Sequence, residues 1–262
     1  MSEVMLDHNN NVATVTLNRP EHLNTISQPM LLALSEALLA CEHDPKVRAV
    51  VLTGAGKAFC AGLDLQDAAS EEGVARSGFA LSTTLDLRSF PPVVLHRMDT
   101  PVICAINGGA AGFGLDLALG CDVRLCSSRA KLSAAFTRRG VLPETGGTWL
   151  LPRLIGWQRS AELVLTGRTL SASEAEELGL VAHVMEPEAL PSAARTLAEE
   201  IAGCAPLAVQ AAKRMMRSGL TESFESHIER VYLQTLPLLG TRDFEEGFRS
   251  FLEKRPPRFE GR

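Results

Sequence analysis

Two glycine-rich segments, each directly after an apolar run, contain the residue types that could do chemistry in this chain. They are Val50–Leu65 (VVLTGAGKAFCAGLDL) and Pro101–Asp122 (PVICAINGGAAGFGLDLALGCD). Glycine adopts positive φ angles without strain and lets a ligand approach the backbone closely. In the second segment, Gly112-Phe113-Gly114 opens an apolar helical run, so the unpaired first N–H groups of that helix face the turn. The two turns could therefore direct backbone N–H groups at one anionic oxygen, although each could also be a purely structural turn.

Neither segment has the spacing of a standard nucleotide-binding loop. A P-loop ending at Lys57 would need glycine at Val51 and Ser or Thr at Ala58. A dinucleotide-binding fingerprint that begins at Gly112 would need glycine at Leu117. We therefore do not expect either segment to bind a nucleotide phosphate in the usual way.

Composition and charge narrow the class of partner. The chain has 262 residues and a net charge of −5, without a broad basic stripe, so we expect a small-molecule partner and no nucleic acid. No apolar run reaches transmembrane length and Met1–Asn11 is polar, which predicts a cytoplasmic protein with no membrane partner. The six cysteines lack CxxC spacing and are interpreted as mostly buried thiols of a reducing compartment.

The elements that must position the two turns alternate between strand and helix patterns. Strands are expected at Val12–Leu17, Val47–Thr53, Pro101–Ile106 and Asp122–Cys126. Ser27 can cap an intervening helix whose apolar stripe contains Leu31, Leu34, Leu38 and Cys41. This alternation predicts an α/β core with parallel crossovers.

Two further regions have a different character. The segment from about Gln66 to Arg97 has weak helical periodicity and is interpreted either as a flap over a pocket or as a surface excursion. Beyond Gly156 the pattern is helical almost throughout, with a capping box at Ser171–Glu174. These later helices could cover the core or pack on a neighbouring molecule.

The ordered motifs along the chain resemble the crotonase, or enoyl-CoA hydratase/isomerase, superfamily. The matching stretches are Leu17–Pro20, Leu52–Gly54, Lys57–Asp64, Asn107–Gly108, Ala111–Gly112, Pro143–Thr148, Leu165–Gly167 and Phe251–Arg255. The resemblance covers essentially the full length. It implies a spiral of ββα units over residues 1–200 and a C-terminal helical trimerisation region over residues 201–262, assembled as a homotrimer or a dimer of trimers.

The shared chemistry of that superfamily is stabilisation of a CoA thioester enolate by two backbone amides. Carried over, the donors are the N–H groups of Leu63 and Phe113, which agrees with the independent interpretation of two converging turns. Many family members have glycine where this chain has Phe113, and the role needs only the amide.

The resemblance also indicates which carboxylates surround the enolate. Of the two hydratase glutamates, the first corresponds to Asp116 and the second to Phe136, which cannot transfer a proton. Glu144 occupies the position where isomerase branches have an acid. We expect Glu144 to be the principal base and acid, and Asp116 to be an auxiliary acid or a group that positions the substrate. Alternatively, Glu144 is only a carboxylate that stabilises a helix N-terminus, and Asp116 is only an ordinary aspartate in the first turn of a helix.

CoA recognition is expected from the resemblance at the Arg19–Leu23 turn, at both glycine turns and near the C-terminus. The first glycine turn contributes the backbone of Ala61–Leu65. The expected CoA or substrate contacts are His22, Ala61, Gly62, Asp64, Leu65, Gly112, Phe251 and Lys254. Phe251 and Lys254 could reach the site from a neighbouring subunit. CoA is part of the substrate, so no separate cofactor is expected, and no metal is expected because no His, Cys or Asp cluster has ligand spacing. The six histidines are interpreted as ordinary surface or structural residues.

The expected function is an acyl-CoA isomerase that shifts a double bond, or opens or rearranges a ring, with motifs most similar to the phenylacetate-pathway branch. One carboxylate suffices for a double-bond shift, whereas addition of water needs a group that activates the water. The first alternative is a 2-enoyl-CoA hydratase of the fatty-acid β-oxidation type, which would be a lyase. The second is a non-catalytic acyl-CoA-binding protein that has kept the scaffold.

Overall fold

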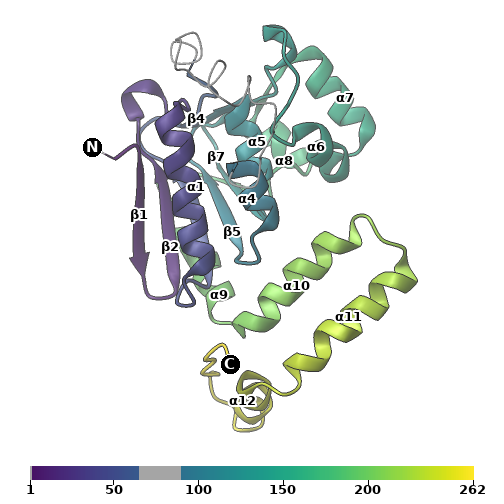
Figure 1. Ribbon diagram of the computed structural model, residues 1–262. Helices are drawn as coiled ribbons and strands as arrows, with labels where there is room; N and C mark the ends of the chain where they lie inside the picture. The colour runs from purple at the N-terminus through teal and green to yellow at the C-terminus, as the bar shows by residue number, and fades with distance from the viewer. Residues whose placement is uncertain (1, 65–89) are drawn as a thin grey trace.

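Two β-sheets wrapped by helices form the core of the computed structural model, which describes residues 2–64 and 90–262 (Figure 1). Within these residues, a six-stranded sheet has the order β1-β2-β3-β5-β7-β10 and a four-stranded sheet has the order β4-β6-β8-β9. The first sheet comprises Val4–Asn9, Val12–Leu17, Ala49–Gly54, Val102–Ile106, Val123–Ser127 and His183–Met185. The second comprises Ala58–Cys60, Gly109–Ala111, Lys131–Ser133 and Thr169–Ser171.

The predicted strands form the parallel centre of the larger sheet. β2 pairs in parallel with β3, β3 with β5, β5 with β7 and β7 with β10. These central strands are largely buried, which explains their near-continuous apolar sequences. The antiparallel edge strand β1 was not predicted, because only Val4 of its six residues is buried and the outward residues are mostly polar.

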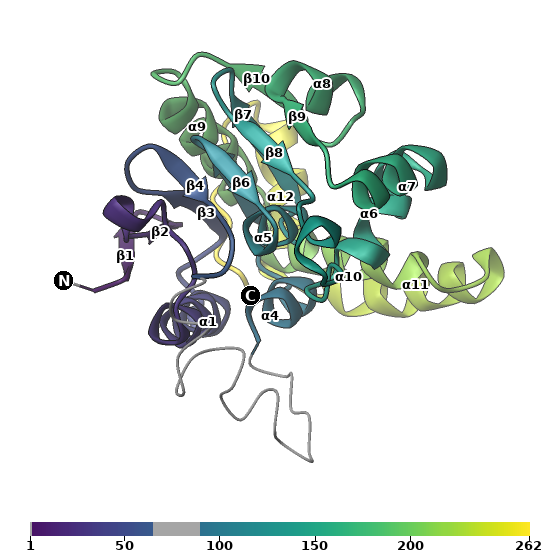
Figure 2. The same ribbon diagram turned by 90° about the horizontal axis from the view of Figure 1, so that it is seen from above.

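A strand–strand–helix unit repeats along the chain and alternates between the two sheets. The unit β5–β6–α5 is the clearest example, with α5 at Phe113–Leu119, and Figure 2 shows β4, β6 and β8 side by side with α5 next to them. The sequence pattern indicated one long strand before each glycine-rich turn. The structure instead divides each segment into a long strand of the first sheet and a short strand of the second.

The helices agree with their sequence signals, with one correction. The Ser27 side chain accepts a hydrogen bond from the Met30 N–H and caps α1 at Gln28–His43, and Ser171 forms the predicted capping box. The region beyond Gly156 is not helical almost throughout, because β9 and β10 interrupt it; each has only three residues, too few to show a period of two.

The remaining helices cover the sheets and extend beyond them. They are α4 (Pro91–Arg97), α6 (Gly147–Ile155), α7 (Trp157–Thr166), α8 (Ala172–Glu177), α9 (Leu190–Ala202), α10 (Pro206–Gly219), α11 (Phe224–Leu238) and α12 (Arg242–Leu252), with short 3₁₀ turns at Pro20–His22 and Thr137–Arg139. α9 packs on the larger sheet through residues such as Ala194 and Ala198. α10, α11 and α12 extend away from the sheets (Figure 1).

Ion pairs join the first of these C-terminal helices to the core. Lys213 of α10 lies 2.7 Å from an Asp122 oxygen and donates to the Thr100 carbonyl. Arg217 pairs with Asp99 at 2.9 Å. The predicted division at residue 200 falls in the last turn of α9, and the assignment of two domains stays a prediction.

Part of the segment predicted as a flap or surface excursion lies outside the described residues, namely 66–89, as does Leu65. The described end of that segment is α4, where Val94 and Leu95 are buried in the core. The described end of the segment therefore packs into the core and is not a surface excursion.

The turn between β5 and β6 generates a stability prediction, because two adjacent glycines there differ in their surroundings. A Cβ at Gly108 would lie 2.0 Å from the Lys57 carbonyl oxygen, whereas a Cβ at Gly109 would meet nothing within 4 Å. Backbone must move to relieve the first contact, so we expect Gly108→Ala to lower the free energy of unfolding by roughly 1–3 kcal/mol.

Gly109→Ala is the matched control for that prediction and should change the free energy of unfolding by less than about 1 kcal/mol. Urea unfolding followed by circular dichroism would measure both variants. Equal destabilisation by the two substitutions would show that close backbone packing at Gly108 is not the cause.

Candidate active site

The two glycine-rich turns lie side by side because each follows one strand of a parallel pair. β4 pairs with β6, with Ala58 opposite Gly109. The carboxyl ends of parallel neighbours meet at the same edge of a sheet, so the turns that leave them meet as well. A Cβ at Gly62 would lie 3.1 Å from the Ala111 carbonyl oxygen, and the φ of +108° is one that residues with a side chain rarely adopt, so glycine suits this close approach.

The N–H groups of Leu63 and Phe113 are available at these turns. Ile26 uses the neighbours of Leu63, since its N–H donates to the Gly62 carbonyl and its carbonyl accepts from the Asp64 N–H. Phe113 is the first residue of α5, where an N–H has no intrahelical acceptor. Neither N–H donates a hydrogen bond to any residue within 2–64 or 90–262. The geometry therefore supplies two free donors at adjacent turns, as an oxyanion site requires.

The Phe113 side chain is part of the core. It is 2% exposed and its ring meets the Phe90 ring edge-on, with 5.9 Å between centroids. The preceding Gly112 has φ +52° and ψ −122°, a conformation that side-chain-bearing residues rarely adopt. Gly112 thus turns the chain so that the Phe113 ring enters the core while its amide stays at the turn.

Asp116, in the first turn of α5, is fully buried and held by the loop before α6. Its Oδ2 accepts hydrogen bonds from the Thr145 hydroxyl at 2.7 Å and from the Gly147 N–H at 3.0 Å. Its Oδ1 has no partner among the described residues. Burial raises the Asp116 pKa to about 6, these hydrogen bonds oppose the increase, and the nearby Glu144 charge adds to it.

Glu144 lies in the same loop and lines a cavity of about 550 Å³. α4, the end of α5 and the first turn of α6 form the walls, which include Phe90, Trp149 and Leu150. Glu144 as a whole residue is exposed, yet burial of its carboxyl group raises its pKa above the ordinary value. A carboxylate with a raised pKa beside an apolar cavity is suited to accept and return a proton.

Phe136 places an apolar ring beside the second glycine turn. It is 5% exposed, and its Cε1 lies 4.0 Å from where a Cβ on Gly112 would be. In the resemblance, Phe136 occupies the position of the second hydratase glutamate. A phenylalanine cannot transfer a proton at this position.

The expected CoA contacts fall into two groups. Near the glycine turns, Asp64 pairs with Arg19 at 3.0 Å and both side chains are 14% exposed. His22 ends the 3₁₀ turn beside them and is exposed. Ala61, Gly62 and Gly112 belong to the turns themselves, so the structure brings this group together with Leu63 and Phe113.

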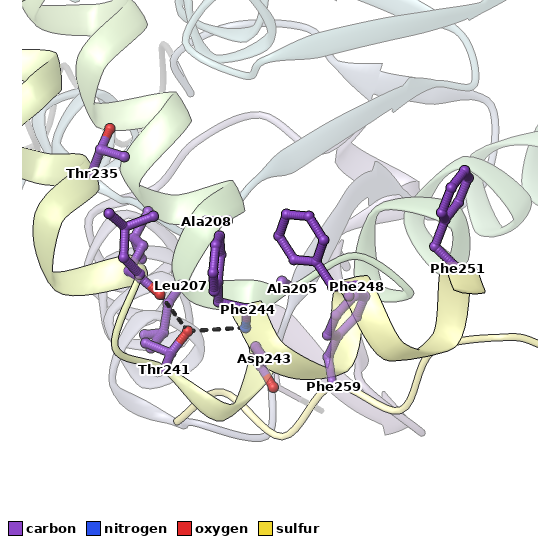
Figure 3. Close-up of a pocket in the computed structure, with 13 residues that line it drawn as sticks. Ala205, Leu207, Ala208, Thr235, Thr241, Asp243, Phe244, Phe248, Phe251 and Phe259 are labelled. Atoms are coloured by element: carbon purple, nitrogen blue, oxygen red, sulfur yellow. Dashed lines mark hydrogen bonds between the residues drawn. The ribbon is translucent and has the colours of Figure 1, made fainter. Parts of the chain in front are cut away.

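Phe251 and Lys254 lie apart from that group within one chain. They are in and just after α12, at the end of the molecule opposite α5 and α6 (Figure 1). Phe251 is 81% exposed and lines a separate cavity of about 480 Å³, with the aromatic side chains of Phe244, Phe248 and Phe259 (Figure 3). Their expected role at the CoA site stays a prediction that depends on a second copy of the chain.

Two residues that support the site are not among those expected from the sequence. Thr145 anchors Asp116, and the fully buried Asn24 donates to the carbonyls of Ala55 and Ala58 at the start of β4. Thr145 lies in the Pro143–Thr148 stretch that carries the family resemblance, so the sequence could have indicated that it lies near the site. Asn24 offered none, because a polar residue in a turn is usually solvated.

Two structural features are absent from the part of the chain that the structure describes. Within it, no helix combines the length and apolar character needed to cross a membrane. Nor do three His, Cys, Asp or Glu side chains of the described ranges gather closely enough to hold a metal ion.

Comparisons with known proteins agree with this arrangement. The sequence model of the enoyl-CoA hydratase/isomerase family matches residues 7–262. The chain is 39% identical to the 1,2-epoxyphenylacetyl-CoA isomerase of Escherichia coli K12 over 100% of both chains. It is 40% identical to the (E)-benzylidenesuccinyl-CoA hydratase of Thauera aromatica, over 98% of this chain and 99% of that protein.

Solved structures show the same similarity in three dimensions. The crystal structure of enoyl-CoA hydratase from Bacillus anthracis superposes with a TM-score of 0.92 and 36% identity, covering 99% of this chain and 100% of that one. Sequence and fold agree over nearly the whole length, and the spiral of alternating strands confirms the expected architecture. The chain therefore belongs to the enoyl-CoA hydratase/isomerase, or crotonase, family.

Proposed function

We propose that the protein is an acyl-CoA isomerase that moves a double bond through a thioester enolate. The observation that carries the proposal is the placement of Glu144, whose carboxylate borders the cavity and has a raised pKa. The Phe90 ring lines this cavity and contacts the Phe113 ring, so the cavity borders the helix α5 that begins at Phe113. In the proposal, a substrate held at the two free amides extends its acyl group toward Glu144.

The proposed reaction needs one proton carrier. The Glu144 carboxylate takes a proton from the α-carbon of a 3-enoyl thioester, and the electron pair of that C–H bond moves toward the thioester oxygen. The N–H groups of Leu63 and Phe113 donate to this oxygen and stabilise the dienolate. Protonated Glu144 then returns the proton to the γ-carbon, which gives the 2-enoyl thioester and restores the carboxylate.

The surroundings of Asp116 favour isomerisation over hydration. Hydration needs a group that activates a water molecule beside the substrate. Asp116 is fully buried, and its Oδ2 is occupied by Thr145 and Gly147. Phe136 offers no proton-transfer group on the other side of the turn. We assign Asp116 as a positioning residue that holds the Glu144 loop against α5.

Assembly into trimers, or dimers of trimers, is part of the proposal. None of the described residues of α11 is buried, and its exposed apolar side chains include Phe224, Ile228, Tyr232 and Leu236. Apolar surface on this scale is usually covered by another molecule. A neighbouring copy would also bring Phe251 and Lys254 closer to a CoA site, where the lysine could face phosphate.

Replacement of the proposed proton carrier tests the reaction directly. We expect Glu144→Gln to lower kcat for conversion of a 3-enoyl-CoA to the 2-enoyl-CoA by roughly 10²- to 10⁴-fold, because an amide cannot carry the proton. The rise in ultraviolet absorbance of the conjugated thioester would report turnover. Glu177→Gln, at an exposed position of α8, is the matched control and should leave kcat unchanged.

The competing functions predict different results in the same assay. Rapid addition of water to a 2-enoyl-CoA by the wild-type enzyme, with slow conversion of the 3-enoyl-CoA, would identify a hydratase instead. Tight acyl-CoA binding without exchange of α-protons for solvent deuterium would identify a non-catalytic binding protein. Near-normal isomerase turnover by Glu144→Gln would reject the assignment of the base.

The raised pKa of Asp116 predicts a pH dependence of stability. The folded protein holds this proton up to about pH 6, whereas the unfolded chain releases it near 3.8. The stabilising contribution is thus complete below about pH 4 and is lost as pH rises through 6. The free energy of unfolding of wild type relative to Asp116→Asn should fall by up to about 3 kcal/mol between pH 4 and pH 7.

Denaturant unfolding at several pH values would measure that difference. Asp7→Asn, on the exposed face of β1, is the control for replacing an aspartate by asparagine at a site without burial. A constant difference for Asp116→Asn would contradict the raised pKa.

A further inference from the structure

Arg19 is a largely buried cation beside the first glycine turn that the proposed reaction does not use. Its side chain is 14% exposed. Nη1 donates to the Thr25 carbonyl at 2.7 Å, and Nη2 donates to an Asp64 carboxylate oxygen at 3.0 Å. Nε lies 3.4 Å from a Glu3 oxygen. Because a guanidinium is planar and rigid, contacts at three of its nitrogens hold it in one orientation.

Two peptide groups connect the Arg19 guanidinium with the Leu63 N–H. The Thr25 carbonyl, which accepts from Arg19, belongs to the same peptide group as the Ile26 N–H. That N–H donates to the Gly62 carbonyl at 2.8 Å, and this carbonyl shares its peptide group with the Leu63 N–H. The peptide bonds of the described residues are trans, so C=O and N–H point to opposite sides of each group. A continuous chain of hydrogen bonds therefore runs from the Arg19 charge to the expected oxyanion donor.

The contacts of Arg19 also hold both chain segments that form this connection. Ile26 and Leu63 form an isolated parallel bridge, and Ile26 is fully buried. The Asp64 N–H donates to the Ile26 carbonyl at 3.0 Å on the other side of the bridge. Arg19 binds Thr25 on one segment and Asp64 on the other, the residues directly next to the bridge. The orientation of the Leu63 N–H is therefore fixed before a ligand binds.

The Asp64 carboxylate gives the Arg19 charge a second effect. Asp64 directly follows Leu63, so its negative charge opposes the build-up of negative charge on an oxygen bound at the Leu63 N–H. The ion pair with Arg19 offsets this repulsion. Glu3 also faces the guanidinium, through a different nitrogen.

We propose that Arg19 is a positioning residue of the oxyanion site, and that its positive charge strengthens the Leu63 N–H as a donor through the chain of peptide groups. When Arg19 donates to the first carbonyl of the chain, it makes the N–H of that peptide group a stronger donor, and the next peptide group responds in the same way. A thioester oxygen then meets a polarised donor as negative charge develops on it.

This inference rests on the proposed function in one respect, since a thioester oxygen must bind at the Leu63 N–H. It does not depend on the reaction that follows. The carbonyl stretching frequency of a bound, unreactive thioester reports how strongly its oxygen is polarised. Butanoyl-CoA, isotope-labelled at the thioester carbonyl carbon, is a suitable probe because it has no double bond to move.

Infrared difference spectroscopy of the full-length protein would measure that frequency. We expect the wild-type protein to lower it relative to free butanoyl-CoA, and Arg19→Gln to lose much of this lowering. In Arg19→Gln, kcat for a 3-enoyl-CoA should fall about ten- to hundredfold, less than for loss of a whole donor, while KM changes by less than about threefold. Arg19→Lys keeps the charge but not the planar fork, so its lowering should be intermediate.

Asp64→Asn separates polarisation from simple support of the turn. The asparagine keeps an oxygen that can accept from Arg19 and removes the negative charge next to Leu63. The lowering of the carbonyl frequency should therefore be retained or increased. A loss as large as that in Arg19→Gln would overturn the inference, because it would show that the ion pair only holds the turn in place.

Arg195→Gln is the matched control. Arg195 also bridges a backbone carbonyl and a carboxylate, those of Asn9 and Glu199, but it lies on α9. This variant should leave both the carbonyl frequency and kcat unchanged. Because Arg19→Lys and Asp64→Asn test the same chain of hydrogen bonds, the test remains decisive even where Arg19→Gln folds poorly.

Two further results would overturn the inference. One is a wild-type protein that leaves the carbonyl frequency of bound butanoyl-CoA unchanged. The other is an Arg19→Gln variant with the frequency and kcat of the wild type. If the frequencies follow the expected order but the wild-type protein does not isomerise a 3-enoyl-CoA, the proposed reaction is contradicted and the role of Arg19 stands.

Discussion

Parallel pairing of β4 with β6 is the constraint on which the candidate site depends. The two strands have only three residues each, yet their pairing brings two turns together that are about fifty residues apart in sequence. Asn107 strengthens the arrangement, because its side chain accepts from the Gly54 N–H and donates to the carbonyls of Gly56 and Ala58. With the turns fixed by backbone pairing, the unused N–H groups of Leu63 and Phe113 lie at adjacent turns before any ligand arrives, and such preorganisation is what makes backbone donors effective in stabilising developing charge.

A second physical link couples the donor helix to the proposed base. Asp116 belongs to α5 and Thr145 to the loop that carries Glu144, so the hydrogen bond between them joins the helix that begins at Phe113 to the loop of the proposed proton carrier. The arrangement has a cost, since a carboxylate that is fully buried with one unpartnered oxygen is poorly solvated. This poor solvation of the charged form is the main cause of the raised pKa of Asp116. The same burial distinguishes the two acids, because Glu144 lines the cavity whereas Asp116 is fully buried.

The C-terminal helices connect to the cavity through α4. Arg217 donates to the Met98 carbonyl just after α4, and Asp99 accepts from both Arg214 and Arg217. Glu42 of α1 accepts from the Asp99 and Thr100 N–H groups on the other side of this short connection. The helix that presents Phe90 and His96 to the cavity is therefore held between the core and α10.

Local pattern in the sequence determined the elements that are long or strongly capped. The strands at Val12–Leu17 and Val102–Ile106, the helix capped by Ser27 and the box at Ser171 follow from periodicity and hydrogen-bonding side chains within a few residues. Motif spacing also indicated the family and the two oxyanion donors. Only the tertiary structure decided that a second sheet of three-residue strands brings the donors together, that Asp116 is enclosed by Thr145 and Gly147, and that His96 faces the same cavity as Glu144. These features depend on contacts between residues distant in the chain, and strands of three residues are too short to leave a periodic signal that a sequence pattern could detect.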